Sequence, residues 1–427
     1  MMKRVITLAL VCIMAFSLLL TGCGQAPAAE GSTSTAVTAA TTPATSTPEE
    51  ATAAEPTAKA PSVKVGVIYI GDENEGYTAA HMAGIDEMAK TLGLSADQVI
   101  EKTSIKEDES CYDAAVDLAD QGCTIIFANS FGHETYMMQA AKEYPEIQFC
   151  HATGYQAKSS GLPNMHNYFT AVYESRYVSG VVAGLKLNDM IASGKITADK
   201  AKIGYVGAYP YAEVVSGYTS FYLGAKSVCP TATMEVQYTN SWADMAGEKE
   251  VATQLIADKC VLISQHADTT GAPTACENAS VPCVGYNVDM ISVAPNNALT
   301  SATINWGPYY TYAVKSVIDG TPIATDWCQG YKDGAVAISA LNDKAIAAGT
   351  ADKVKETEDA LKAGTLHVFD TAKYTVGGKT IEDLIKAGGD FAKYADYVKD
   401  GYFHESEVIS APAFDLRIDG ITEKTKK

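Results

Sequence analysis

Acidic, amide and aromatic side chains follow several short apolar segments of this 427-residue chain. The first apolar segment, residues 63–70, leads into an acidic turn, Gly-Asp-Glu-Asn-Glu-Gly at residues 71–76, and then into Tyr77. Carboxylates and amides form hydrogen bonds in the plane of a flat ring, whereas aromatic faces stack on it. These residue types suit a planar, nitrogen-rich ligand if the fold brings them together.

The loops that follow the predicted strands carry most of the candidate ligand-binding residues. These candidates are Asp72, Tyr77, Asn129, Ser130, Phe131, Glu213, Trp242, Asp268 and Asp289. Ligands of open parallel α/β sheets bind outside the carboxyl ends of the strands, so we expect these side chains to line one cleft between two lobes. Few cations accompany them, which disfavours a phosphate and favours an uncharged base or nucleoside.

Each candidate also has a purely structural explanation. Asp72 and Asn129 could cap the helices that follow them, as Asp and Asn often do. Tyr77 and Trp242 could be core aromatics, and Asp268 could be a solvated loop acid. The functional interpretation therefore depends on their convergence at the strand ends.

The elements that must position these residues follow an alternating pattern. Strand candidates lie near residues 63–70, 98–103, 123–128, 146–152, 203–207, 233–238, 260–264 and 281–286, with helical patterns between them. Strands that alternate with helices predict an α/β fold with parallel sheets. A long helical stretch at residues 168–190 divides the eight strands into two groups of four, which favours two similar lobes over a closed eightfold barrel.

The predicted domain organisation follows from this division. We expect an N-terminal lobe at residues 63–170, a C-terminal lobe at 171–300, a return to the first lobe at 301–330, and a tail at 331–427 that braces both lobes. Residues 299–303 are expected to form a crossing strand. The tail pattern predicts a strand at residues 334–340, a charged helix near 343–362 and a hairpin that turns at Gly377 and Gly378.

The N-terminus has the features of a lipoprotein signal peptide at residues 1–22. Lys3 and Arg4 precede an uncharged apolar run, and Leu20-Thr21-Gly22-Cys23 resembles the bacterial lipobox. Cys23 would then carry the lipid anchor that holds the protein on the extracytoplasmic face of the cell membrane; an uncleaved signal anchor is the alternative. Residues 23–62 are rich in Ala, Thr and Pro without aromatic residues, which predicts a disordered linker.

Composition and motif searches narrow the function further. The net charge is −19, and loss of Lys3 and Arg4 makes it −21, so nucleic acid is not an expected partner. Eight cysteines outside the N-terminal segment are scattered in apolar runs, which favours buried free thiols over disulfides and disfavours a zinc site. The folded part contains no Gly-x-Ser-x-Gly motif, zinc-protease helix or phosphate loop. We therefore predict a protein without cofactor or metal that is not an enzyme.

Five stretches share the pattern of a known family. They are residues 71–81 (GDENEGYTAAH), 173–180 (YESRYVSG), 203–213 (IGYVGAYPYAE), 238–242 (YTNSW) and 299–306 (LTSATINW). In this order and spacing they resemble the basic membrane protein family of bacterial substrate-binding lipoproteins, which includes the purine nucleoside receptor of spirochaetes. The resemblance implies a type I periplasmic-binding-protein fold, with two Rossmann-like lobes that hinge around a ligand and deliver it to an ABC transporter permease.

The resemblance also implies roles for individual residues. Tyr77 and Trp242 would stack on the two faces of a purine, while Asp72 and Asp289 would bind ribose hydroxyls or ring nitrogens. Trp306 stands where nucleoside-binding relatives carry a lysine, which points to a free base, and it could add a wall to the pocket.

Glu213 is expected to accept hydrogen bonds from an exocyclic amine or a ring N–H. Two alternatives stay open. One is a surface-anchored nucleoside hydrolase that uses the acidic run at residues 72–75. The other is a sensor without a transporter that binds a sugar or a flavin.

Overall fold

A computed structural model describes residues 63–424. The expected signal peptide, lipid anchor at Cys23 and linker lie outside the described residues. Within residues 63–424, none of the helices has the length and apolar character that crossing a bilayer requires.

The first of two large sheets is parallel throughout and has the order β11-β5-β4-β3-β1-β2. Its strands are β1 (Val65–Ile68), β2 (Val99–Lys102), β3 (Ile125–Ala128), β4 (Gln148–Ala152), β5 (Met165–Thr170) and β11 (Asp326–Gln329). Ile125 and Phe127 face one layer of helices, whereas Ile126 and Ala128 face the other. Alternate side chains of a strand point to opposite faces, so a sheet covered on both sides has continuous apolar strands.

The second sheet has the order β12-β10-β9-β8-β6-β7-β15. Its strands are β6 (Lys202–Gly207), β7 (Thr233–Tyr238), β8 (Leu262–His266), β9 (Cys283–Asn287), β10 (Ala298–Ile304), β12 (Val336–Ile338) and β15 (Ile421–Lys424). All neighbours are parallel except β12, which runs antiparallel to β10. A small antiparallel pair, β13 (Val398–Lys399) and β14 (Tyr402–Phe403), lies in the tail.

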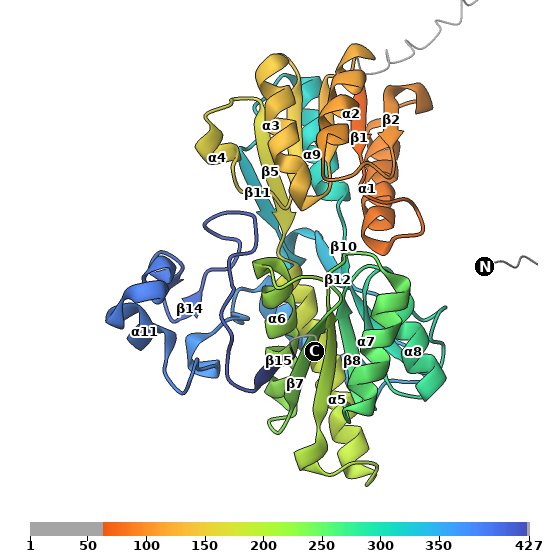
Figure 1. Cartoon of the computed structure of the whole chain (residues 1–427), viewed down its shortest axis with the longest axis vertical. Coiled ribbons are helices and arrows are strands. Elements are labelled where there is room, and N and C mark those ends of the chain that lie inside the picture. The colour runs from red at the N-terminus through yellow and green to blue at the C-terminus, as the bar shows by residue number, and fades with distance from the viewer. Residues whose placement is uncertain (1–62, 425–427) are drawn as a thin grey trace, which may run out of the picture. The chain divides into compact units, whose positions relative to one another are not determined.

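Helices cover both faces of each sheet (Figure 1). Those of the first lobe are α1 (Gly76–Leu92), α2 (Glu109–Asp120), α3 (Glu134–Glu143), α4 (Ala157–Ser160) and α9 (Gly307–Asp319). Those of the second lobe are α5 (Val172–Ala192), α6 (Ala212–Val228), α7 (Met245–Ala257), α8 (Gly271–Ala279) and α10 (Thr350–Lys362), and α11 (Ile381–Ala387) belongs to the tail. Short 3-10 helices are η1 (Ala96–Gln98), η2 (Phe131–His133), η3 (Ala198–Lys200), η4 (Tyr331–Asp333), η5 (Thr371–Lys373) and η6 (Gly389–Tyr394).

The chain passes between the two sheets three times. It leaves the first sheet after β5 for α5, returns after β10 for α9, and leaves again between β11 and β12. Two open sheets joined in this way exclude the closed eightfold barrel. Residues 299–303 do not cross between the lobes, because β10 pairs with β9 inside the second sheet and the return begins only at α9.

The predicted helical stretch at residues 168–190 is partly wrong. Tyr168, Phe169 and Thr170 belong to β5, and α5 begins at Val172. The strand is completely buried between β4 and β11, and its pairing partner β11 lies more than 150 residues later in the sequence. A long-range pairing of this kind leaves no local periodicity to detect, so the prediction of two groups of four strands missed it.

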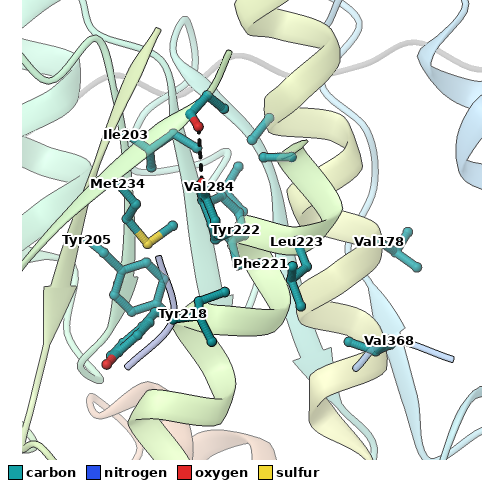
Figure 2. Packing of buried hydrophobic residues seen from close by; sticks show 14 of the residues in the cluster. Val178, Ile203, Tyr205, Tyr218, Phe221, Tyr222, Leu223, Met234, Val284 and Val368 are labelled. Carbon is teal, nitrogen blue, oxygen red and sulfur yellow. Dashed lines mark hydrogen bonds between the residues drawn. The ribbon is translucent and has the colours of Figure 1, made fainter. Parts of the chain in front are cut away.

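The core of the second lobe depends on close contact between α5 and α6. A Cβ at Gly180 of α5 would lie 2.0 Å from the Phe221 carbonyl oxygen, and one at Gly224 of α6 would lie 2.1 Å from the Tyr177 carbonyl oxygen. Only glycine permits this approach of two helix backbones. Figure 2 shows the aromatic side chain of Tyr218 of α6 beside the sheet within the same cluster.

The tail contacts both lobes. Strand β15 extends the second sheet beside β7, and Glu423 of β15 accepts hydrogen bonds from the hydroxyls of Tyr218 and Tyr238 at 2.6 and 2.7 Å. On the other side, the Ser410 backbone N–H donates to the Asp326 carboxylate of β11 at 2.8 Å. The hairpin predicted at Gly377 and Gly378 is present as a tight turn, closed by a single antiparallel bridge between Val376 and Lys379.

Glu405 organises the last part of the tail. Its buried carboxylate accepts from the backbone N–H groups of Ala413 and Phe414, each at 2.9 Å. We predict that Glu405→Ala lowers the free energy of unfolding by roughly 2–4 kcal/mol, because each unpaired buried donor costs about 1–3 kcal/mol. Urea unfolding followed by near-UV circular dichroism measures this loss.

The Glu405→Gln variant keeps an acceptor oxygen and should lose much less stability. Asp396→Ala, at an exposed acid of the same tail, is the control and should be nearly neutral. Equal losses for Glu405→Ala and Glu405→Gln would contradict the role given to the two N–H groups.

Candidate functional site

A cavity lies where the strand ends of the two lobes meet. Its empty volume is about 560 Å³, including the part open to solvent. It is lined by Ile70, Gly71, Glu75, Tyr77, Asn129, Ser130, Phe131, Thr153, Glu213, Trp242, Ala243, His266, Asp268 and Tyr286. This lining contains no lysine or arginine.

The wall from the first lobe is built by the ends of β1 and β3 and the start of α1. Asn129 holds this wall together, since its Oδ1 accepts from the Ile70 N–H at 2.9 Å and its carbonyl oxygen accepts from the Tyr77 hydroxyl at 2.6 Å. The Tyr77 ring is therefore fixed in place against the cavity. Neither side chain acts only as a helix cap or a core filler.

Helix α1 begins at the cavity, and Glu75 is its N-cap. The Glu75 carboxylate accepts from the N–H groups of Tyr77 and Thr78 at 2.8 and 2.9 Å, and Gly93 caps the other end of the helix in a left-handed conformation. The Gly76 N–H donates to the Asp268 carbonyl oxygen of the second lobe at 2.9 Å. The two lobes thus meet beside the cavity, because Asp268 and the two neighbours of Gly76, Glu75 and Tyr77, line it.

Trp306 supports Tyr77 from behind. Its ring is completely buried, stacks on His81 with centroids 4.0 Å apart and meets Tyr77 edge to face at 6.0 Å. Tyr77 and His81 also meet edge to face at 4.5 Å. Trp306 is therefore part of the core of the first lobe and does not form the cavity wall.

The second lobe contributes an aromatic wall around Trp242. The Trp242 ring lies 5.2 Å from Tyr209 and 6.1 Å from Tyr211, while its carbonyl oxygen accepts from the Asp268 N–H at 2.9 Å. Tyr77 and Trp242, which belong to different lobes, both line the cavity. They could contact one flat ligand from two sides.

The acids of the second lobe are deprived of water. Burial raises the pKa of Glu213 to about 7, although the positive charge of Arg176 opposes this shift. Burial and the charges of Glu75, Glu248 and Glu213 raise the pKa of Asp268 well above its usual value. Asp268 accepts from the Asn287 side-chain amide at 2.7 Å. Near neutral pH, then, this group of acids holds protons that ordinary carboxylates would release.

His266 lies beneath Glu213 and is held neutral. Its Nε2 is 3.3 Å from Glu213 Oε1, and burial followed by the charge of Arg176 lowers its pKa well below the usual value. Gly217 of α6 makes room for the ring, because a Cβ there would lie 2.4 Å from His266 Nδ1. Among residues 63–424, no cluster of His, Cys, Asp and Glu has an arrangement that could hold a metal ion.

Arg176 of α5 is a buried cation that lies next to the cavity lining. Its Nη1 donates to the Gln265 carbonyl oxygen at 2.6 Å, and its guanidinium lies 3.5 Å from the ring centroid of Tyr286, which lines the cavity. The positive charge of Arg176 therefore acts on Glu213 and Asp268, although the guanidinium packs on Tyr286 and is not itself part of the cavity lining. The carboxylates of the cavity keep their acceptor oxygens for other partners.

Seven of the ten predicted residues line the cavity, namely Tyr77, Asn129, Ser130, Phe131, Glu213, Trp242 and Asp268. The structure places Asp72, Asp289 and Trp306 outside this lining. Asp72 accepts from the Asn74 N–H at 2.9 Å, and Asp289 is exposed and accepts from the Ile291 N–H at 2.9 Å. Both acids therefore stabilise turns.

Seven lining residues were not among those candidates: Ile70, Gly71, Glu75, Thr153, Ala243, His266 and Tyr286. Thr153 directly follows β4, and His266 is the last residue of β8, so the strand-end rule could have found both. Tyr286 lies within β9, one residue before its end, so a rule that considers only the loops after the strands does not select it. Glu75 was assigned to an acidic surface run, because its burial depends on the second lobe.

The cysteines are buried, as expected. All eight cysteines of the described part are free thiols, and seven of them are buried; Cys328 is partly exposed.

Comparison with known proteins shows which family this architecture belongs to. A family described as "Bmp: ABC transporter substrate-binding protein PnrA-like" matches residues 62–365. The chain is 32% identical over 339 residues to the purine-binding protein of Brucella abortus (strain 2308), covering 77% of this chain and 91% of that relative. It is also 32% identical over 245 residues to a protein of Haloferax volcanii provisionally named ABC transporter glucose-binding protein TsgA13, covering 57% and 59%.

A solved structure supports the fold independently. The ABC transporter solute-binding protein from Aeropyrum pernix K1 superposes with a TM-score of 0.61 at 15% identity, covering 72% of this chain and 93% of that one. The predicted family and fold are both confirmed. The chain belongs to the Bmp family of PnrA-like ABC transporter substrate-binding proteins and has the type I periplasmic-binding-protein fold with two Rossmann-like lobes.

Proposed function

We propose that this protein is the lipid-anchored, extracytoplasmic receptor of an ABC importer and that its cavity binds a purine base. Tyr77 and Trp242 contact the two faces of the base, while Glu213 and Asp268 accept hydrogen bonds from its N–H groups. Asn129 and Ser130 supply further polar contacts at the rim of the ring. The base is delivered to the permease without chemical change.

The observation that carries this proposal is the composition of the cavity wall. Two aromatic side chains from different lobes and three carboxyl groups line one small space, without a cation to bind a phosphate. Flat rings stack on aromatic faces, and buried acceptors need N–H or O–H donors. A purine base provides both features in a single rigid molecule.

A sugar is the competing ligand, because the Haloferax relative carries a glucose-binding name. Sugars also offer hydroxyl donors to carboxylates. Calorimetry of the purified protein with adenine, hypoxanthine, guanine, adenosine, glucose and riboflavin separates these classes. Binding of glucose without binding of any purine would contradict the proposed ligand and leave the family assignment intact.

The stacking role of Trp242 predicts a selective loss of affinity. We expect Trp242→Ala to weaken adenine binding by at least about tenfold, because stacking on an aromatic ring contributes roughly 1–3 kcal/mol per base. Trp242→Phe keeps a ring and should lose much less. Asp289→Asn, at an exposed acid outside the cavity, is the control and should bind as the parent does. Calorimetric Kd values that are equal for Trp242→Ala and Trp242→Phe would refute the stacking.

Affinity should also depend on pH through Glu213. With a pKa of about 7 in the free protein, Glu213 is mostly protonated at pH 6 and mostly ionised at pH 8. A bound N–H donor favours the ionised form, so affinity should rise about tenfold from pH 6 to pH 8 for a base that does not titrate in this range.

Calorimetry of Glu213→Gln tests the assignment, since the amide oxygen still accepts a hydrogen bond but does not titrate. We expect Glu213→Gln to remove most of the pH dependence, while Asp289→Asn keeps it. An unchanged dependence of affinity on pH in Glu213→Gln, or a parent affinity that falls towards pH 8, would show that another group titrates on binding.

Membrane attachment depends on Cys23 in this proposal. We expect the Cys23→Ser protein to leave the membrane fraction and to appear in the soluble extracytoplasmic fraction, because it has no thiol to carry lipid. Mass spectrometry of the parent protein should find a lipid on an N-terminal cysteine. An unmodified Cys23, or an unchanged fractionation of Cys23→Ser, would contradict lipid anchoring.

A further inference from the structure

A second compartment adjoins the main cavity, and we refer to it as the side pocket. Its empty volume is about 760 Å³, including the part open to solvent. Phe131, Thr153, Glu213 and Trp242 line both spaces, so the two adjoin each other. A substituent of a ligand in the main cavity that passes these shared side chains would enter the side pocket.

The outer wall of the side pocket comes from the tail. Ile409, Ala411, Pro412 and Ala413 line it, and all four lie beyond residues 62–365, the part that matches the Bmp family. This wall therefore lies outside the part of the chain that the family model matches. Any selectivity that the wall confers depends on the tail segment at residues 409–413.

The tail wall is fixed at both ends. The Ser410 N–H donates to Asp326 of the first lobe at 2.8 Å, and the N–H groups of Ala413 and Phe414 donate to buried Glu405. The Phe414 ring is completely buried and stacks on Phe369 with centroids 4.2 Å apart. The wall is therefore a built surface and offers a defined shape to a ligand.

The opposite walls are aromatic and unusually exposed. Phe131, Tyr155 and Tyr211 are 42%, 52% and 46% exposed, although large apolar side chains are costly to leave in water. The Phe131 ring lies 6.2 Å from Tyr155 and 5.8 Å from Tyr211, so the three rings form one surface contributed by both lobes. An apolar group bound here would cover part of this surface.

The side pocket has few polar side-chain groups apart from those on its aromatic rings. Thr153 donates its hydroxyl to the Ala152 carbonyl oxygen, Glu213 lies at the junction with the main cavity, and Tyr155, Tyr211 and Trp242 add their ring O–H and N–H groups. A ribose in this space would have to satisfy all its hydroxyls with these few groups or with water, because an unpaired hydroxyl costs free energy on removal from water. An alkyl or aryl group has no hydroxyls that need partners, and it would gain contacts with the aromatic rings.

From this geometry we propose that the side pocket binds an apolar substituent on the exocyclic nitrogen of a purine base. The inference rests on the proposed function. Glu213 borders both spaces, so an exocyclic N–H donated to Glu213 places the second substituent of that nitrogen at the entrance of the side pocket. The protein then prefers N6-alkyl or N6-aryl adenines to adenine, and it prefers adenine to adenosine.

Calorimetry with adenine, N6-benzyladenine and adenosine tests this preference. We expect N6-benzyladenine to bind at least tenfold more tightly than adenine, and adenosine to bind no more tightly than adenine. Equal Kd values for adenine and N6-benzyladenine, or tighter binding of adenosine, would overturn the side-pocket proposal and leave purine binding intact. Failure of these three compounds to bind would overturn the side-pocket proposal, and failure of hypoxanthine and guanine as well would overturn the proposed function itself.

Two variants locate the effect. Ala411→Trp fills the side pocket and should abolish the gain for N6-benzyladenine while adenine binds within about twofold of the parent. Tyr155→Ala removes an exposed wall residue, so the variant should fold as the parent does, and it should reduce the gain severalfold. Ala363→Trp, at an exposed alanine after α10, is the matched control and should keep the full preference. An undiminished preference in both Ala411→Trp and Tyr155→Ala would overturn the assignment to this pocket.

Discussion

The burial of carboxyl groups where the two lobes meet is the constraint on which the site depends. A carboxylate that leaves water must find donors or take up a proton. Glu75 is satisfied by two N–H groups of α1, and Asp268 accepts from the Asn287 amide. Among the described residues, the hydrogen-bonding partner of Glu213 is His266 at 3.3 Å. Burial lowers the pKa of His266 and so keeps its ring neutral. Glu213 is therefore the acid that gains most from a ligand N–H.

Arg176 limits the cost of this burial without consuming the acceptors. Its positive charge lowers the pKa of Glu213 and of Asp268 against the effect of burial. A guanidinium in direct contact with either acid would occupy the carboxylate oxygens as a bidentate pair. Arg176 instead donates to a backbone carbonyl and lies over Tyr286. The positive charge of Arg176 thus partly offsets the cost of burying Glu213 and Asp268, while its guanidinium donates its hydrogen bond to a backbone carbonyl and not to these acids.

Sequence reasoning succeeded where local pattern determines structure. The turn at Gly377 and Gly378 and most strand positions follow from short-range periodicity and turn chemistry, and the strand-end rule led to the seven candidates that line the cavity. It failed where distant segments meet. Strand β5 lies between β4 and the distant β11, and half-buried Glu75 lines a cavity to which both lobes contribute. Trp306 was expected at the ligand, but its stacking on His81 places it behind Tyr77.

The contacts between the lobes link cavity shape to lobe movement. The Gly76 to Asp268 hydrogen bond joins two residues at the cavity, and a Cβ at Gly76 would lie 3.1 Å from the Asp268 carbonyl oxygen. Separation of the lobes must break this bond and move Asp268 away from α1. The tail resists the same movement, since Ser410 is bonded to the first lobe while β15 belongs to the second sheet. Because this tether also carries the wall of the side pocket, lobe opening and the shape of that pocket must change together.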